Sequence, residues 1–261
     1  MFSMEKRCRY GANQLVEVIC QLRFPEILTI SANPPVEFQE AIRSQYPQFH
    51  RRMEIPAPKI TGAPGHFALE NQPSNVNYQF STADGNWRVN LTGKFISLSC
   101  TKYTCWEEFA AYLDKPLAAF IRIYQPAYFE RVGLRYVNAF SRITLGLTDS
   151  RFADLFSSRY LGPLSEPEVN EASVARCAVD LEMAIRGGCR VKLHAGPGLI
   201  KRNGNQDQEI KFIFDQDLFM PGQVPVKLSA GALQTLHAQA DSIFRGAITD
   251  TLHDAMDPEQ V

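Results

Sequence analysis

Cations at alternating positions of extended segments are the side chains of this chain that are best suited to binding chemistry. They fall between large apolar residues, so the two-residue period of a strand places them together on the polar face of a sheet. Converging guanidinium groups offer paired donors to a carboxylate or a phosphate. The sequence therefore predicts an anion-binding surface made of Arg23, Arg88, Arg131, Arg135, Arg190 and Lys192.

Two interpretations of these cations stay open. The chain divides into two halves, residues 1–127 and 128–261. If the first strands of these halves meet, we expect Arg23 and Arg135 near the centre of the surface, available to an anionic ligand or partner. The other interpretation is that the cations form ion pairs on a solvated face, which is the commoner arrangement on sheets. The carboxylates available for such pairs are Glu17, Glu130, Asp180 and Glu182.

A hairpin predicted over residues 179–195 would contain one acid–base pair. If Gly187-Gly188-Cys189 forms a three-residue loop, Glu182 lies opposite His194 on the polar face. A carboxylate beside a histidine can transfer protons near neutral pH. An ordinary cross-strand ion pair is the commoner use of such residues, so this pair is a candidate catalytic site with a structural alternative.

Metal and cofactor chemistry have little support in the sequence. Cys100 and Cys105, and likewise Cys189 and His194, stand five positions apart without a second ligand pair at zinc-binding spacing. No Gly-x-Ser-x-Gly elbow or phosphate-binding glycine fingerprint is present. We therefore predict no metal and no cofactor.

His237 and Asp241 are a further titratable pair, spaced four residues apart on a predicted helix. Side chains at this spacing are neighbours on one face of a helix. The ordinary interpretation of such a pair is an exposed surface contact, and this is what we expect here.

The segments that carry the cations recur in the sequence. Residues 22–24, Leu-Arg-Phe, precede a stretch over 38–46 with Phe, Glu, Ile, Ser and Tyr at alternate positions. Residues 134–136, Leu-Arg-Tyr, precede a similar stretch over 152–160. Self-similarity over this distance indicates two copies of one supersecondary unit.

Each copy is predicted to contain a strand, a short helix, three or four antiparallel strands and a long helix. The fold class is therefore α+β, with two tandem β-α-β(3–4)-α repeats over residues 1–127 and 128–261. Antiparallel sheets commonly have one polar face and one face packed on helices. We expect one globular unit with one curved antiparallel sheet and both long helices on one face, a layout similar to tandem half-repeats of the TATA-binding-protein-like fold.

The hairpins over residues 76–101 have the best-defined register. Pairing 78 with 91, 80 with 89 and 91 with 96 puts nearly every large apolar residue on one face and leaves the other polar but almost uncharged. Residues 47–65 contain four prolines and are expected to be an extended connector. The predicted helices span 36–46, 105–124, 149–160 and 229–256, and Pro116 is expected to kink or split the second of them.

Composition restricts the class of protein. The 261 residues are 45% hydrophobic and 21% charged, with a formal net charge of −1, which disfavours a nucleic-acid partner without closing that option. No run of 18 apolar residues indicates a membrane span. The six scattered cysteines and the absence of a secretory signal predict free thiols and a cytoplasmic location.

Three motifs carry a resemblance to a known family. The stretch from Arg131 to Asn138, Arg-Val-Gly-Leu-Arg-Tyr-Val-Asn, is similar to a recurrent motif of a sporadically distributed bacterial family of proteins of about this length. Trp106-Glu-Glu-Phe109 and Phe244-x-x-x-Ile248-Thr-Asp250 fit the same family. The resemblance covers nearly the whole chain and implies a bacterial cytosolic protein, but it transfers no site residue.

Three functions are compatible with these observations. The first is a non-enzymatic binding or interaction protein that uses the open sheet face for an anionic ligand or a protein partner. The second is an enzyme that acts on an anionic substrate with the Glu182–His194 pair. The third, which depends on the resemblance alone, is an accessory component of a defence or toxin-neutralising locus. A homodimer is plausible in each case because an open sheet has edges that need cover.

Overall fold

An antiparallel sheet forms the centre of the molecule, which we describe from a computed structural model that covers residues 1–5, 7–54, 59–63, 66–70, 75–202 and 205–260. The chain is mixed α+β, as predicted. Among the described residues the main sheet has nine strands. In spatial order they are β10 (Val179–Ala184), β11 (Arg190–Gly198), β14 (Lys211–Val224), β9 (Phe129–Phe140), β2 (Leu15–Arg23), β8 (Phe95–Cys100), β7 (Trp87–Leu91), β6 (Asn75–Ser81) and β3 (Gln48–Glu54).

The predicted register of β6, β7 and β8 is confirmed. Tyr78 lies opposite Leu91, Phe80 lies opposite Val89, and Leu91 in turn lies opposite Ile96. All five of these side chains are almost fully buried. A slip of one residue would turn them to solvent, so the burial of one face fixes the pairing.

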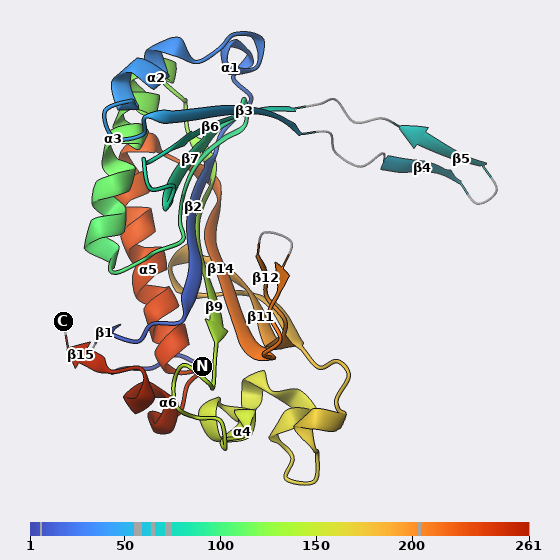
Figure 1. Cartoon of the computed structure of the whole chain (residues 1–261). Coiled ribbons are helices and arrows are strands. Elements are labelled where there is room, and N and C mark those ends of the chain that lie inside the picture. Colours follow the sequence, from blue (N-terminus) through green and yellow to red (C-terminus); the bar gives the residue numbers. More distant parts are fainter. Residues whose placement is uncertain (6, 55–58, 64–65, 71–74, 203–204, 261) are drawn as a thin grey trace.

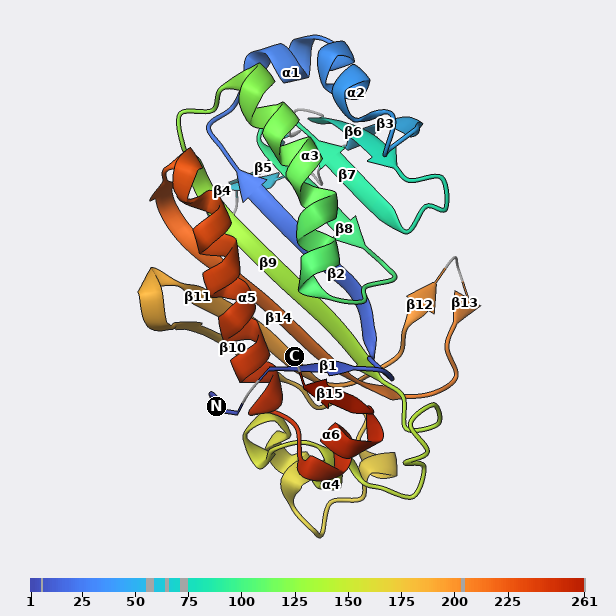
Figure 2. The ribbon, with the colours of Figure 1, turned by 90° about the vertical axis from the view of Figure 1, so that its left-hand side faces the viewer.

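Two long helices lie across the sheet in Figure 2, α3 (Trp106–Tyr124) and α5 (Ser229–Arg245). Figure 1 shows the same two helices together on one side of the strands. Glu107 and Glu108 in the first turn of α3 complement the positive end of the helix dipole. The expected split at Pro116 is wrong, because α3 continues through that residue; the loss of one backbone hydrogen bond is outweighed by a buried apolar stripe that includes Phe109, Leu113 and Phe120.

The other predicted helices are shorter than the sequence pattern indicated. The expected helix over 229–256 ends at Arg245, and a separate α6 (Asp250–Ala255) follows, with the Thr249 side chain accepting from Leu252 N at its start. A capping threonine begins a new helix at this point. The helix expected over 36–46 is α2 (Val36–Ile42), and a further short helix, α1 (Leu28–Ala32), precedes it. The helix expected over 149–160 is α4 (Phe152–Leu155), and a short 3₁₀ turn follows it.

The connector expected over residues 47–65 is in part a strand. β3 closes one edge of the main sheet, and β4 (Lys59–Ala63) pairs with β5 (His66–Glu70) in a separate hairpin. Figure 1 shows this hairpin standing off from the sheet on the side away from α3 and α5. Residues 55–58 and 64–65 of the expected connector lie outside the described residues.

The core lies between the sheet and the helices. Trp87 stacks on Tyr112 of α3 with ring centroids 4.0 Å apart, and Phe156 stacks on Phe212 of β14 at the same distance. Large rings packed in this way supply much of the apolar area that stabilises a fold. Opposite the helices, one face of the main sheet has no helix over it in Figure 1, and we call it the uncovered face.

The two ends of the chain meet on the helix side. β1 (Cys8–Tyr10) pairs with β15 (Pro258–Gln260), and Ser3 N donates to Ser242 O of α5 at 2.9 Å. The N-terminal segment is therefore held across α5. Among the described residues, no helix is both long enough and apolar enough to cross a membrane.

Candidate functional site

Arginines on the central strands of the uncovered face are held by two aspartates of β14. Arg135 donates through Nε and Nη2 to the two oxygens of Asp215, at 2.8 and 2.5 Å. Arg131 Nη2 donates to Asp217 Oδ1 at 2.5 Å. The bidentate contact raises the pKa of Arg135 above its usual value. Paired guanidinium groups of this kind are poor receptors for an external anion because the carboxylate neutralises their charge and already takes one or two of their five N–H donors.

Gly133 explains how Arg131 reaches its partner. A side chain at Gly133 would begin 2.1 Å from Arg131 Nη1, so the guanidinium occupies the space above this glycine. There it also lies over the ring of Phe219, 4.5 Å from the centroid. The glycine in the Arg131–Asn138 motif therefore makes room for an internal ion pair.

The outer strands of the same half repeat this pattern. Glu182 lies 3.1 Å from Arg190 and 3.6 Å from Lys192. His194 Nδ1 lies 2.8 Å from Asp180 Oδ1. A hollow of about 460 Å³ opens here, and its lining includes both cations and carboxylates.

The predicted Glu182–His194 pair is wrong. In the observed register Glu182 lies opposite Lys192, and His194 lies opposite Asp180. Gly187 and Gly188 both have positive φ, so they form the turn, and Ile185 N donates to Cys189 O to close it. The three-residue loop is thus 186–188, one position earlier than predicted, which shifts the pairing by two residues while keeping every side chain on its face.

The other half of the uncovered face is polar and nearly neutral. Gln79 Nε2 donates to Asn90 Oδ1 at 3.0 Å, and Asn90 Nδ2 donates to Ser97 Oγ at 3.3 Å. Although no helix covers them, Gln79 and Ser97 are only 8% and 5% exposed, because neighbouring side chains shield them. This ladder links β6, β7 and β8.

Arg23 and Arg88 lie in this neutral half. Both are exposed, and neither forms an ion pair or a side-chain hydrogen bond with any residue that the structure describes. Arg88 lies opposite Ser81 and Ser99, which carry no charge. A hollow of about 260 Å³ adjoins Arg23. Gln21, Phe95 and the ion pair of Lys94 Nζ with Glu26 Oε2, 3.6 Å apart, are in its lining.

The structure does not bring Arg23 and Arg135 together as the sequence suggested. β2 and β9 do pair, but antiparallel, so Arg23 lies opposite Arg131 and Arg135 lies opposite Ile19. The predicted set of six cations thus divides: Arg131, Arg135, Arg190 and Lys192 are paired, whereas Arg23 and Arg88 are available. Glu17 and Glu130, two of the expected partners, form no ion pair among the described residues.

Sequence reasoning missed the two aspartates that decide this division. Asp215 and Asp217 alternate with Phe214, Gln216 and Leu218 in a strand of period two. This pattern was enough to predict that both aspartates lie on the polar face. It also missed Arg52, an exposed cation of β3 opposite Asn77. Within the part of the chain that the structure describes, no group of three or more His, Cys, Asp or Glu side chains is placed to hold a metal ion.

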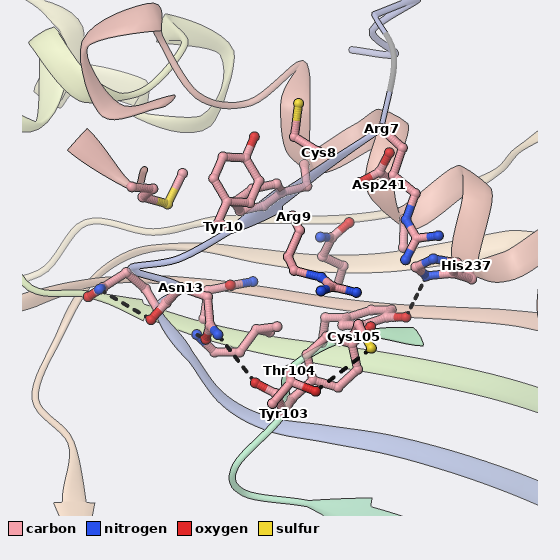
Figure 3. A pocket seen from close by; sticks show the side chains of 18 residues that line it. Arg7, Cys8, Arg9, Tyr10, Asn13, Tyr103, Thr104, Cys105, His237 and Asp241 are labelled. Carbon is pink, nitrogen blue, oxygen red and sulfur yellow. Dashed lines mark hydrogen bonds between the residues drawn. The ribbon is translucent and has the colours of Figure 1, made fainter. Parts of the chain in front are cut away.

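A cavity on the opposite, helix-covered face is the second candidate site (Figure 3). It lies between the central strands β9 and β14, helix α5 and the N-terminal strand β1. His237 and Asp241, predicted to be an exposed pair, both line it, so that prediction is wrong. The face of α5 that carries them is covered by the N-terminal segment, which the sequence pattern of α5 alone does not reveal.

A scan of the sequence against models of protein families matched none, and a search among curated proteins found no match. The bacterial family resemblance and the cytoplasmic location therefore stay predictions.

Proposed function

We propose that this protein is a non-enzymatic binding protein that docks an acidic polypeptide segment on the neutral half of its uncovered face. The surface is defined by the polar residues of β6, β7 and β8 together with Arg23 and Arg88. The observation that carries the proposal is that these two exposed arginines have no ion pair with a described residue, although carboxylates pair with the cations of the neighbouring half.

Charge complementarity favours an acidic occupant. The neutral ladder of Gln79, Asn90 and Ser97 does not compete for the arginine donors. An approaching carboxylate would therefore gain charge-assisted hydrogen bonds without displacing an internal partner. Complementary potentials of this kind favour both encounter and specificity.

The half of the uncovered face formed by β9, β14, β11 and β10, which we call the paired half, is a poor alternative for the same ligand. Its cations are matched in number by carboxylates, so an anion there would meet a surface of mixed sign. The groups involved are Arg131, Arg135, Arg190 and Lys192 against Asp180, Glu182, Asp215 and Asp217.

We further infer that the two halves of the sheet, residues 1–127 and 128–261, are copies of one unit. Support comes from the strand order, which runs outward from the centre as β2-β8-β7-β6 on one side and β9-β14-β11-β10 on the other. It also comes from the matching positions Phe38 and Phe152, and Tyr46 and Tyr160, which are all buried. A homodimer through the sheet edges β3 or β10 stays a prediction.

Fluorescence anisotropy with a labelled peptide of alternating glutamate and serine tests the binding proposal. We expect the wild-type protein to bind, with an affinity that falls as salt is added. Arg23→Gln with Arg88→Gln should weaken binding about tenfold, since each exposed contact contributes about 0.5–1 kcal/mol.

The matched control is Arg190→Gln with Lys192→Gln, which removes the same number of charges from the paired half. It should change the affinity less than about twofold. Equal losses in the two double variants, or no binding by the wild-type protein, would contradict the proposal. A single-stranded oligonucleotide in place of the peptide distinguishes recognition of an acidic polypeptide from recognition of any polyanion.

A further inference from the structure

The helix-covered face of the central strands contains a polar patch where a continuous apolar core is expected. Tyr136 of β9 lies opposite Gln216 of β14, and Asn138 follows two residues later on the same face. Gln216 is 2% exposed, and its Oε1 has no hydrogen-bond partner among the described residues. A buried acceptor without a partner costs about 1–3 kcal/mol, so its presence calls for an explanation.

His237 of α5 lines the same cavity and contacts this patch at Tyr136. Its Nδ1 lies 2.8 Å from Tyr136 Oη, and the indole of Trp106 stacks on its ring at 4.7 Å and 11°. These two contacts therefore hold the imidazole ring in one orientation. Its Nε2 is buried and, like Gln216 Oε1, has no partner among the described residues.

The charged residues that line the cavity are Arg7 and Arg9 of the N-terminal segment and Asp241 of α5, and Arg9 is exposed. Arg7 donates to both oxygens of Glu107, at 2.9 and 3.4 Å, and holds the pKa of that carboxyl at about 2. Figure 3 shows Arg7, Asp241 and His237 gathered at one end. Burial lowers the pKa of His237 to about 4 and raises the pKa of Asp241, so the histidine that lines the cavity together with Gln216 is uncharged at neutral pH.

Aromatic rings form much of the cavity wall. Tyr10 meets Phe244 edge to face at 5.7 Å, and Tyr103 meets Tyr136 at 6.0 Å. Such rings pack favourably against the face or edge of another ring. The cavity volume is about 90 Å³, several times the roughly 10–15 Å³ that one water needs.

We propose that this cavity binds a small uncharged ring compound whose edge carries a hydrogen-bond donor beside an acceptor, as the edges of nucleobases do. The amide of Gln216 matches such an edge because it offers an oxygen acceptor and a nitrogen donor side by side. His237 Nε2 supplies a further polar contact, and the tyrosine rings supply the apolar one. Because Gln216 Oε1 and His237 Nε2 are both buried in the unliganded protein, binding requires the two side chains to turn toward the ligand. The site lies on the opposite face of the sheet from the peptide-binding surface and does not depend on it.

Titration calorimetry of the full-length protein with adenine, cytosine, hypoxanthine and uracil tests this assignment. Indole, which has the ring and a donor but no adjacent acceptor, is the comparison compound. We expect at least one base to bind and to raise the Tm, and indole to bind at least tenfold more weakly. Failure of all four bases to bind at millimolar concentration would overturn the proposal.

Two variants locate the binding. Gln216→Leu should weaken binding of that base at least tenfold and raise the Tm of the unliganded protein, because it removes the unpartnered acceptor. Gln234→Leu, on the exposed face of the same helix as His237, should leave binding unchanged. If Gln216→Leu does not fold, His237→Gln serves in its place. Undiminished binding in the folded variant would show that the base sits elsewhere.

Discussion

On the uncovered face, one row of side chains crosses the described strands of the main sheet. The charges in this row differ between its two halves. From β3 to β2 its only charged member is Arg88, which lies between two serines. From β9 to β10 its charges alternate in sign. In spatial order the row contains Gln48, Ser81, Arg88, Ser99, Ile19, Arg135, Asp217, Lys192 and Glu182.

The difference shows that the type of a residue does not decide its role on this face. Arg88 and Arg135 occupy the same row, yet Arg135 donates two hydrogen bonds to Asp215 while Arg88 has no ion pair with a described residue. The alternating charges of one half stabilise the pairing of its strands. The isolated arginines of the other half are left available to a partner.

The largest effect that we predict is a loss of stability at acid pH, and it comes from His237 on the helix-covered face of the sheet. In the folded protein burial lowers the pKa of His237 from 6.5 to about 4, so between these two pH values the unfolded chain binds a proton that the folded chain does not. Through His237 alone, the free energy of unfolding should therefore fall by about 3 kcal/mol between pH 6.5 and pH 4, and Asp241 offsets part of this loss. Urea unfolding across this range measures the loss.

His237→Gln should reduce this acid sensitivity. The groups that face the ring are Arg7, Glu107, Tyr136 and Asp241, and Asp241, with its raised pKa, acts in the opposite direction as pH falls. A variant that loses as much stability on acidification as the wild type would show that the ring is not held neutral by burial. Comparisons between the two halves of the uncovered face are therefore best made at pH 7.

The second prediction concerns the innermost ion pair of the paired half. Asp217→Asn should lower the free energy of unfolding by about 2 kcal/mol, because it removes a charged partner from a guanidinium that is largely shielded from water. Arg131 and Asp217 side chains are 19% and 28% exposed. Glu182→Gln, at a pair of which both members are more than 40% exposed, should cost less than about 1 kcal/mol. Chemical denaturation of both variants at pH 7 measures the contrast.

The third prediction tests the role of Gly133. Gly133→Ala should cost about 1 kcal/mol, because the new methyl group displaces the Arg131 guanidinium from Phe219 and Asp217. Combined with Asp217→Asn it should cost less than the sum of the two, since both changes disrupt the same contact. Strict additivity in this double-mutant cycle would mean that Arg131 keeps its position without the glycine.

The smallest predicted effect is on the neutral half. Arg23→Gln and Arg88→Gln should each change the free energy of unfolding by less than about 0.5 kcal/mol, because no described partner is lost. Removing Arg23 also relieves the like charge of Arg131 directly opposite. A loss above about 1 kcal/mol in either variant would show that the arginine is structural and that the two halves do not differ as described.

Much of the fold could be predicted from hydrophobic alternation. The register of β6, β7 and β8 followed from it because only one pairing buries Tyr78, Phe80, Leu91 and Ile96 together. The register of β10 and β11 did not follow, because a shift of two residues leaves every side chain on the same face. The backbone geometry of Gly187 and Gly188 decided the position of the turn, and the alternation of apolar residues contains no information about that geometry.

The candidate sites were predictable in part, for a similar reason. Alternation placed the six cations on one face, but which of them are paired depends on neighbours across strands that are distant in the sequence. The cavity was missed because it requires β1, α5 and β14 to meet. Gln216 interrupts the apolar positions Phe212, Phe214 and Leu218, and this is the one local signal that could have indicated it.

Photo-crosslinking of the glutamate–serine peptide, with a photoreactive group at each end in turn, tests most directly which half of the uncovered face binds. We expect crosslinks to β2, β6, β7 or β8, within residues 15–23 and 75–100, and their loss in the Arg23→Gln, Arg88→Gln double variant. Crosslinks to β10, β11 or β14, within residues 179–224, that survive in that variant would contradict it.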